Sequence, residues 1–292
     1  MLAPITKPRL RSRPIGAADI DRVVALLARG FPLRNRDYWR RALDKLAAHR
    51  TPAEMPQYGF LMENGDEVVG VILLLFASIP ADGTAQIRCN LSSWYVEPAF
   101  RSHAWLLIAH ALRFKDVTYV NISPALHTRP IIAAQGFTCY SHGQFVAAPA
   151  LSLRNPPGGA TVMEIDGVPA QHVRSDERDL LADHKAHGCI SVWCVTGSEA
   201  HPFVFLPRRI QGFLPCVQLV YCRHVRDFVR LAAPLGRYLL ARGRAFVIID
   251  ADGAIPGLAG RYFADKAPKY FRGPDRPNLG DLAFTEAVLF GL

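Results

Sequence analysis

The sequence lacks the long apolar segments that would place it in a membrane. Its longest apolar run, Val68–Ala77, has about half the residues that a transmembrane helix needs. This run instead predicts a strand that is buried on both faces. The first residues, MLAPITKPRLRSRP, lack the apolar region of a secretory signal, so we expect a cytoplasmic location and no membrane insertion.

Cysteine is scarce and unpatterned. The six cysteines form no CxxC pair and no dense framework, which argues against a disulfide scaffold. In a cytoplasmic chain we expect reduced, mostly buried thiols. One loose cluster places His184, His187 and Cys189 close together, with Cys194 beyond. Zinc uses such ligands, but the spacing matches no standard zinc finger, so we expect no metal.

Several catalytic signatures are also missing. The chain has no Walker loop, no Rossmann fingerprint, no GxSxG elbow and no Ser-His-Asp pattern. Acidic residues are in the minority, since 34 Lys and Arg face 25 Asp and Glu, a formal net charge of +9. This charge favours acidic partners such as nucleic acid, anionic lipid or a phosphorylated cofactor. The basic residues form no long block, so a solvated basic surface is the simple alternative.

The length of the chain, 292 residues, indicates two domains, because a single core stops growing near this size. The best linker candidate is the Pro- and Gly-rich stretch LRNPPGGA, Leu153–Ala160. We therefore predict a first domain over residues 1–152, a linker over 153–160 and a second domain over 161–292.

Local patterns give the first half its elements. The i, i+3, i+4, i+7 spacing before Gly30 predicts an amphipathic helix, with Gly30 as a left-handed cap at its end. A second helix follows, and then Asn64-Gly65 between two β-type runs predicts a hairpin. A third strand, AQIRCNLSSWYV, enters a helix through Glu97-Pro98. A strand (DVTYVNIS), a short helix (HTRPIIAAQGF) and a closing strand pair (TCYSHGQFVAA) complete this half.

The second half repeats this plan. Its pattern predicts a helix, a strand pair, a third strand, a helical stretch interrupted or restarted at Pro234, a short buried strand and a final strand, DLAFTEAVLFG. Before that final strand, the residues Gly260–Asp281 are predicted to form a long loop that shapes an acceptor pocket or an inter-domain cleft, with a plain surface loop as the alternative. Its residues of interest are Tyr262, Lys269, Tyr270 and Arg272. The halves can be registered without a gap over about 30 residues, a repeat of pattern rather than of sequence. The register places Ala104 on Ala233 and Asn121 on Asp250.

The order of these elements resembles the GNAT superfamily of acyl-CoA N-acyltransferases. Three local matches add to the likeness: RPIGAADI at the start, YVEPAFR before the central helix and AAQGF before the closing strands. The resemblance covers roughly Arg11 to Ala147 well, and Thr161 to Leu292 only in topology. It implies an α/β protein of two GNAT-like domains, each a mixed, mostly antiparallel sheet flanked by helices, the second one degenerate.

The resemblance also implies a cofactor site. In that family the pantetheine arm of acyl-CoA pairs with a splayed fourth strand, and its diphosphate sits on amides at the next helix start. First-turn N–H groups have no partner within the helix, and the helix dipole favours an anion there. We therefore expect acetyl-CoA or another acyl-CoA as co-substrate. The residues implied for its binding are Trp94, Tyr95, Val96, Arg101, Ser102, His103, Ala104 and Trp105.

The match to the family's diphosphate motif, Arg/Gln-x-x-Gly-x-Gly/Ala, is incomplete. Arg101 matches, Ala104 is small enough for close approach, and Leu106 departs from the pattern with a bulky side chain. Two interpretations stay open: a site that still binds a CoA-type anion, or a corner closed by the packing of Trp105 and its neighbours.

Acyl transfer to an amine needs a base for the amine, polarisation of the thioester carbonyl and an acid for the leaving thiolate. The family implies that a backbone N–H of Tyr95 or Val96 polarises the carbonyl. The tyrosine that usually acts as general acid in the family corresponds to Ile132 in this sequence. The family's carboxylate base is missing from the fourth strand.

Substitutes for these two groups lie nearby in sequence. The candidates are Tyr140 as acid, His142 as base and Asn121 at the end of the fifth strand. The alternatives without a catalytic role are a Tyr140 with its hydroxyl in water and a surface His142 in a turn beside Gly143. Glu97 is expected to fix the turn and the helix start.

The leading hypothesis is an acyltransferase that acts on a small-molecule amine. The alternative is an inactive GNAT-like binding or scaffold protein. A third reading, a transferase that takes an aminoacyl group from tRNA, lacks interleaved basic and aromatic residues, so nucleic acid is not the expected partner. A homodimer stays open, as do the acceptor and the acyl length.

Overall fold

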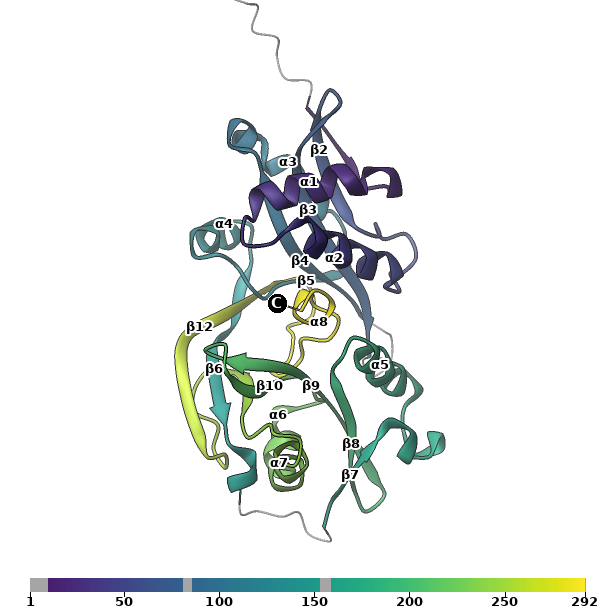
Figure 1. Ribbon diagram of the computed structural model, residues 1–292, viewed down its shortest axis with the longest axis vertical. Coiled ribbons are helices and arrows are strands. Elements are labelled where there is room, and N and C mark those ends of the chain that lie inside the picture. Colours follow the sequence, from purple (N-terminus) through teal and green to yellow (C-terminus); the bar gives the residue numbers. More distant parts are fainter. Residues whose placement is uncertain (1–9, 81–85, 153–158, 292) are drawn as a thin grey trace, which may run out of the picture. The chain divides into compact units, whose positions relative to one another are not determined.

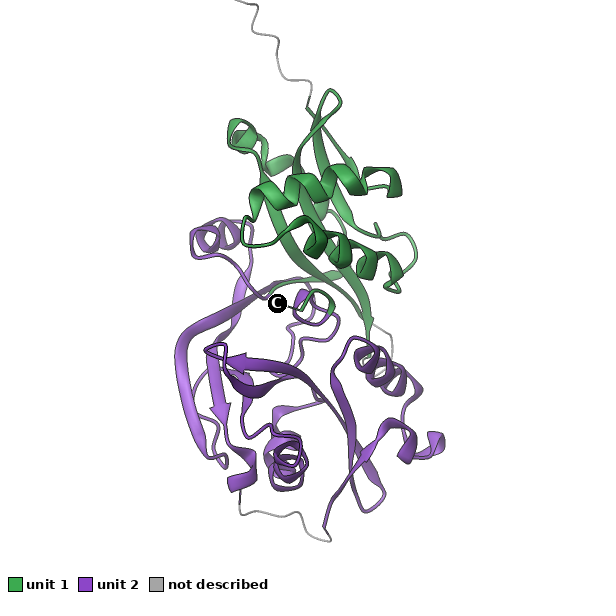
Figure 2. Cartoon of the chain, viewed as in Figure 1, with its two compact units in different colours: residues 1–121, 289–292 green, residues 122–288 purple. Residues whose placement is uncertain are grey.

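The chain divides into two compact units, residues 1–121 with 289–292 and residues 122–288 (Figure 2). The structure, a computed structural model, describes residues 10–80, 86–152 and 159–291. Residues 153–158 of the predicted linker therefore lie outside the described residues. The second unit begins before the predicted first domain ends, so the division by contacts differs from the domains predicted by sequence pattern.

The first unit is a five-strand mixed sheet with helices on both faces (Figure 1). The strand order is β1-β2-β3-β4-β5, and only β4 and β5 run parallel. Its elements are β1 (Leu10–Pro14), η1 (Ala17–Asp19), α1 (Ile20–Gly30), α2 (Arg36–Ala48), β2 (Gly59–Asn64), β3 (Glu67–Ile79), β4 (Gln86–Val96), η2 (Pro98–His103), α3 (Trp105–Ala111) and β5 (Val117–Asn121).

Strand β3 is the centre of this unit. Every residue from Val68 to Ala77 is buried, which confirms the predicted strand with two buried faces. One face, including Val71 and Leu73, packs in the core formed with α1 and α2. On the other face Gly70 lies beside Leu107 of α3. The predicted hairpin is also confirmed, since Asn64 pairs with Glu67 around a tight turn.

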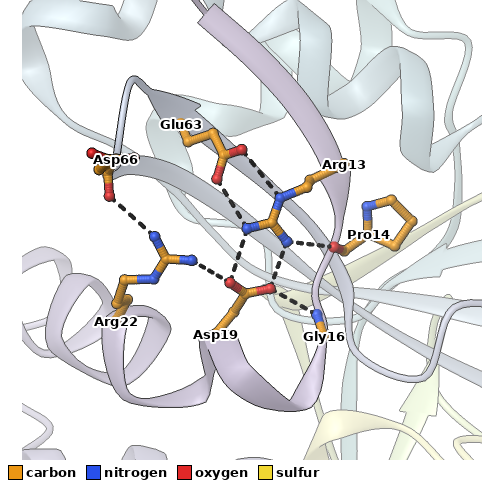
Figure 3. Close-up of polar contacts among 7 residues, drawn as sticks. All are labelled: Arg13, Pro14, Gly16, Asp19, Arg22, Glu63 and Asp66. Atoms are coloured by element: carbon orange, nitrogen blue, oxygen red, sulfur yellow. Dashed lines mark hydrogen bonds and ion pairs between the residues drawn. The ribbon is translucent and has the colours of Figure 1, made fainter.

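A buried carboxylate fastens the start of α1 (Figure 3). Asp19 is 3% exposed and accepts hydrogen bonds from Arg13 at 2.6 and 2.9 Å, from the Gly16 N–H at 2.9 Å and from Arg22. Arg13 also pairs with Glu63 of β2 at 2.9 Å. The hydrogen bonds from Arg13 outweigh the opposing effect of burial, so the pKa of Asp19 lies well below its ordinary value.

The second unit is a seven-strand mixed sheet in the order β12-β6-β11-β10-β9-β8-β7, with β10 and β11 as its parallel pair. Its strands are β6 (Thr138–Ala147), β7 (Thr161–Glu164), β8 (Ile190–Thr196), β9 (Glu199–Ile210), β10 (Leu214–Tyr221), β11 (Val247–Ala251) and β12 (Gly260–Arg272). Its helices are η3 (Leu126–Thr128), α4 (Arg129–Ala134), η4 (Pro149–Leu151), η5 (Ile165–Gly167), η6 (Ala170–His172), α5 (Ser175–Ala186), α6 (Val225–Arg230) and α7 (Ala232–Leu240).

Aromatic residues fill the core of the second unit. Phe203 and Phe205 of β9 both contact the ring of Phe228 on α6. The predicted helical interruption is confirmed, but it falls at Leu231, between α6 and α7. Pro234 lies in the first turn of α7, where its missing N–H leaves no helix bond unmade.

The predicted closing strand pair over residues 138–148 is wrong. Strand β6 is one continuous strand that pairs with β11 on one side and β12 on the other. Gly143 is not a turn residue, because a Cβ there would lie 2.3 Å from the carbonyl oxygen of Phe263 and 2.7 Å from the Tyr262 hydroxyl. The glycine lets β12 approach closely.

The predicted loop Gly260–Asp281 is also wrong over its first part, which is strand β12. The strand is distorted between Ala264 and Lys269, where Asp265 and Ala267 have positive φ values of 57° and 49°. This distortion interrupts the alternation that identifies a strand in a sequence.

The predicted final strand, DLAFTEAVLFG, is a series of buried turns that ends in the short helix α8 (Glu286–Leu289). Phe284 has a φ of 55°, which an extended strand does not allow. No helix within the described ranges is long and apolar enough to cross a membrane.

We predict that Asp19→Asn lowers the free energy of unfolding at neutral pH by about 2–4 kcal/mol, because it leaves Arg13 without its buried partner. A carboxylate with a depressed pKa stabilises the fold above its unfolded pKa and loses that contribution as the pH falls. Urea titrations should therefore show that the difference in the free energy of unfolding between the variant and the wild type becomes smaller below about pH 4. The matched control, Asp21→Asn, removes an exposed pair with Arg40 and should cost at most about 1 kcal/mol. An Asp19 effect as small as the control's contradicts the assigned role.

Candidate functional site

The parallel strands β4 and β5 of the first unit separate part-way along their length. They pair from Ile87 with Val117 to Asn90 with Val120, and no pairing with β5 follows in the described residues. Strand β4 continues from Leu91 to Val96 along β3 alone. Among the described residues of the first unit, no strand pairs with this segment on the side away from β3.

Asn90 lies at the point where the strands separate. Its side chain is 1% exposed, and its Nδ2 donates to the carbonyl oxygens of Leu91 at 3.0 Å and Val120 at 3.3 Å. One oxygen belongs to each diverging strand. The amide thus satisfies buried carbonyls at the end of the shared ladder, which would otherwise be costly to leave unpaired.

A β-bulge follows in β4. Val71 and Leu73 of β3 lie opposite Tyr95 and Ser92, so β4 carries one extra residue there. Ser93 has a φ of 40°, an uncommon value for a residue other than glycine. A bulge bends a strand and re-aims its side chains, and bulges are frequent beside active sites. Trp94, within the bulge, has a buried Nε1–H without an acceptor among the described residues.

The end of α1 is held against this bulged segment. Arg29 pairs with Glu97 at 2.7 Å, and Phe31 contacts the Tyr95 ring. Gly30 is a helical residue rather than the predicted left-handed cap. Its role is steric, since a Cβ there would lie 2.4 Å from the Tyr95 ring. Glu97 fixes the turn as expected, through this ion pair and through its backbone.

The junction after β4 is tightly turned. Phe100 N–H donates to the Glu97 carbonyl at 2.9 Å, and Ala104 N–H donates to the Arg101 carbonyl at 3.1 Å, so these two amides are occupied within η2. The N–H groups of Trp105 and Leu106, in the first turn of α3, donate to no backbone acceptor in the described part of the chain. The Trp105 side chain is 59% exposed, so it does not fill a pocket at this corner.

The predicted cofactor residues thus gather at one end of the first unit. Trp94, Tyr95 and Val96 lie on the diverging part of β4. Arg101, Ser102 and His103 lie on η2, followed by Ala104 and Trp105, and the Ser102 hydroxyl lies 3.1 Å from His103 Nδ1. Asn121 is the last residue of β5. Sequence reasoning missed Asn90 and Gly30 as parts of this arrangement.

The predicted acid and base lie on β6 of the second unit. Tyr140 is 1% exposed, which rules out the alternative of a hydroxyl in water. It forms part of the wall of a cavity of about 310 Å³, together with His224, Arg276 and Asn278. The Arg276 guanidinium donates to the Tyr140 carbonyl at 3.4 Å.

His142 is exposed, in agreement with the alternative of a surface histidine, but it has a carboxylate partner. Its Nδ1 lies 2.8 Å from Asp252 Oδ1, and its backbone N–H donates to the same oxygen at 2.8 Å. Burial opposes the ionisation of Asp252, yet the hydrogen bonds from His142 prevail, and the pKa of Asp252 lies below its ordinary value. A carboxylate on Nδ1 selects the tautomer with a free lone pair on Nε2. Asp252 is 110 residues away in sequence, so no local spacing indicated it.

The residues of interest in the predicted loop have structural partners. Lys269 and Asp250 form a buried ion pair of 2.7 Å, with side chains 2% and 1% exposed. Tyr262 packs over Gly143, and Arg272 donates to the Gln135 carbonyl at 2.9 Å. Tyr270 pairs with Cys139 in the sheet.

His184, from the loose His/Cys cluster, is fully buried with both ring nitrogens engaged by the backbone. Nδ1 lies 2.8 Å from the Leu180 carbonyl, and Nε2 accepts the Phe284 N–H at 3.2 Å. Burial raises the pKa of the Cys189 and Cys194 thiols to about 12, which opposes the thiolate form that zinc binds. No group of three or more His, Cys, Asp or Glu side chains that could hold a metal ion occurs within the described ranges. As expected, the six cysteines are free thiols and mostly buried.

Solved structures resemble this chain although sequences do not. No protein-family model and no curated protein matches it. A GCN5-related N-acetyltransferase from Anabaena variabilis has a TM-score of 0.57 and 11% identity, covering 90% of this chain and 72% of its own. One from Kribbella flavida has a TM-score of 0.54 and 15% identity, covering 91% and 71%. A candidate acetyltransferase from Pyrococcus horikoshii has a TM-score of 0.53 and 11% identity, covering 97% and 96%.

The chain has the GNAT fold. The predicted fold class, mixed and mostly antiparallel sheets flanked by helices, is confirmed. At these identities the likeness shows the GNAT fold alone, and the tandem repeat stays a prediction.

We predict that Gly30→Ala destabilises the protein by about 1–3 kcal/mol, because the new methyl group displaces the Tyr95 ring. Without that ring the same substitution should be neutral or stabilising, since alanine favours a helix by up to about 1 kcal/mol. The effect should therefore vanish or change sign in a Tyr95→Ala background, measured by urea unfolding of the four proteins.

Gly253→Ala is the matched control for this cycle, because nothing lies within 4 Å of a Cβ at Gly253. It should change stability by no more than about 0.5 kcal/mol. Equal costs of Gly30→Ala with and without the Tyr95 ring contradict the steric role.

Proposed function

We propose that the protein is an acyl-CoA-dependent N-acyltransferase, with acetyl-CoA or another acyl-CoA as donor and a small-molecule amine as acceptor. The observation that supports this best is the divergence of β4 from β5 beyond Asn90. Beyond the Asn90–Val120 pair, β4 continues along β3 with no pairing to β5 among the described residues, and an extended chain with amide groups can pair with such a strand edge. The pantetheine arm of CoA has that chemistry.

The residues around the junction fit the charged end of such a carrier. The first-turn amides of Trp105 and Leu106 donate to no backbone acceptor among the described residues, and the exposed side chain of Arg101 precedes them. Amides and a guanidinium together are a donor set for a diphosphate. Leu106 departs from the family motif by its side chain, whereas the amide that would contact an anion is unchanged. The net charge of +9 favours the approach of an anionic carrier.

When bound, the carrier supplies the acyl group as a thioester. The proposed role of the bulge is to present a backbone N–H of Tyr95 or Val96 to the thioester carbonyl oxygen, where negative charge develops. Gly30, Phe31 and the Arg29–Glu97 pair hold this segment in place, because they fix Tyr95 and the end of β4.

We assign proton transfer to β6. His142 is the proposed base for the amine, with Asp252 as a positioning residue that fixes the ring and its tautomer. Tyr140 is the proposed acid for the leaving thiolate, and Asn121 a polar group at the end of β5. These residues would take the roles of the carboxylate and the tyrosine of the family pattern, which this chain lacks. A cytoplasmic location and the absence of a nucleic-acid partner belong to the same proposal.

Charge reversal tests the carrier site. Arg101→Glu should weaken acetyl-CoA binding by about 10- to 100-fold in isothermal titration calorimetry, because it removes a charged hydrogen bond and adds repulsion. Arg11→Glu is the matched control: it makes the same charge change on an exposed residue of β1 and should leave affinity within about 3-fold. Equal losses in both variants would point to non-specific attraction. An absence of binding by wild type to acetyl-CoA and longer acyl-CoAs at millimolar concentration contradicts the proposed function.

The His142–Asp252 pair has a kinetic signature. His142→Gln should lower kcat about 10²- to 10⁴-fold while the affinity for acetyl-CoA stays constant. Asp252→Asn should also lower kcat, and the double variant should be no slower than His142→Gln, because both residues act through one ring. His172→Gln, at an exposed histidine of η6, should leave turnover unchanged. Independent, additive losses contradict the assigned pairing, and an absence of turnover over a broad amine panel favours the inactive scaffold.

A further inference from the structure

The second unit contains another parallel pair that separates. Among the described residues, strands β10 and β11 pair at Val217 with Val247 and at Gln218 with Ile248, and no further pairing follows. Strand β10 then continues to Tyr221 along β9, and a register shift between Leu219 and Tyr221 marks an extra residue in β10. The second unit therefore has the same two features as the first, a diverging parallel pair and an irregularity just beyond the last shared pair.

The difference lies in what contacts the diverging strand. In the second unit the Val220 carbonyl of β10 accepts the backbone N–H of Leu282 at 2.7 Å. Gly280 precedes this bond, and a Cβ there would lie 3.1–3.3 Å from Cys222, Leu219 and Val225. The segment Gly280–Val288, here called the C-terminal segment, thus packs against both β10 and the first residue of α6.

The C-terminal segment is buried, and hydrogen bonds within its turns satisfy its polar groups. Leu282, Ala283 and Thr285 are each 1% exposed. Asp281 Oδ1 accepts the Ala283 N–H at 3.2 Å, and Thr285 Oγ1 donates to the Leu282 carbonyl at 2.7 Å. These turns satisfy polar groups that burial removes from water, so the segment has a defined structure at this position.

His184 provides a second anchor. Its Nδ1 faces the Leu180 carbonyl, which only accepts, so Nδ1 carries the proton. Its Nε2 is therefore an acceptor, and it receives the N–H of Phe284 at 3.2 Å. The two rings also pack with centroids 4.5 Å apart. These contacts hold Phe284 at its φ of 55°, a conformation that is costly for a bulky residue.

We propose that the C-terminal segment fills the gap between the diverging strands β10 and β11 of the second unit. The corresponding gap between β4 and β5 of the first unit is the proposed site for an acyl carrier. The Leu282 amide takes the place on the diverging strand that a carrier amide would use. The chain consequently has one carrier site, in the first unit, and a second gap that its own backbone closes. The number of carrier sites rests on the proposed function, whereas the closure of the gap does not.

Hydrogen–deuterium exchange of the full chain tests the closure without any ligand. Peptides that cover Gly280–Val288 should exchange at least about 100-fold more slowly than an open chain, because the amides of Leu282 and Phe284 are buried and bonded. His184→Leu removes the acceptor for Phe284 and should speed exchange of this segment at least 10-fold. The matched control, His172→Leu, alters an exposed histidine of the same unit and should not.

Wild-type exchange at the open-chain rate overturns the proposal, and this result does not depend on whether His184→Leu folds. Native mass spectrometry at saturating acetyl-CoA provides the second arm. One carrier per chain supports the proposal, and two carriers per chain overturn it. No bound carrier refutes the proposed function, and the exchange of the wild-type segment still decides whether the gap is closed.

Discussion

The proposed chemistry depends on one backbone constraint, the separation of β4 from β5 beyond Asn90. Parallel strands in a sheet normally continue to pair, because an unpaired edge leaves N–H and C=O groups without partners. The Asn90 amide satisfies a carbonyl on each strand at the point of separation, at 3.0 and 3.3 Å. The bulge at Ser93 then turns β4 away from the flat path of a strand. The open edge is thus built into the fold.

The surroundings keep this edge in one conformation. The end of α1 reaches the bulge through the Arg29–Glu97 pair and through the contact between Gly30 and Tyr95. The start of α1 is held in turn by Asp19, whose buried carboxylate joins it to β1 and, through Arg13, to β2. A helix that is fixed at both ends transmits this rigidity to the diverging strand. A preorganised edge binds an extended ligand at a lower entropic cost.

The two units differ in what contacts the diverging strand of their parallel pair. Both pairs separate, and both carry an extra residue beyond the last shared pair. In the second unit the Val220 carbonyl bonds to Leu282 of the same chain. The difference between them lies in the segment Gly280–Val288 rather than in the strands. In our proposal this segment therefore leaves one carrier site in the chain, at β4 of the first unit.

The sequence predicted the features that local pattern controls. The run Val68–Ala77 identified the strand buried on both faces, and Asn64-Gly65 identified the hairpin. The same kind of reasoning located the β4 segment and the following junction. The predicted cofactor residues lie on these elements, at one end of the first unit.

Features that depend on distant partners were not predictable in this way. Gly143 in β6 suggested a turn, because nothing nearby indicated that Phe263 would approach its backbone. Asp252 follows the last residue of β11, and only the pairing of β11 with β6 brings it to His142, which no local sequence pattern indicates. Asn90 did offer a signal, as a polar residue between buried Cys89 and Leu91, but its role needs the position of Val120. The final residues have strand-like composition, and only their tertiary contacts turn them into buried turns.

The most direct test of this account is an amide-resolved NMR titration of the deuterated protein with acetyl-CoA. We expect the largest chemical-shift changes on the amides of Leu91–Val96 and on those of Trp105 and Leu106, with the amide of Leu282 unaffected. Binding that leaves the β4 amides unchanged and perturbs another part of the chain would contradict it.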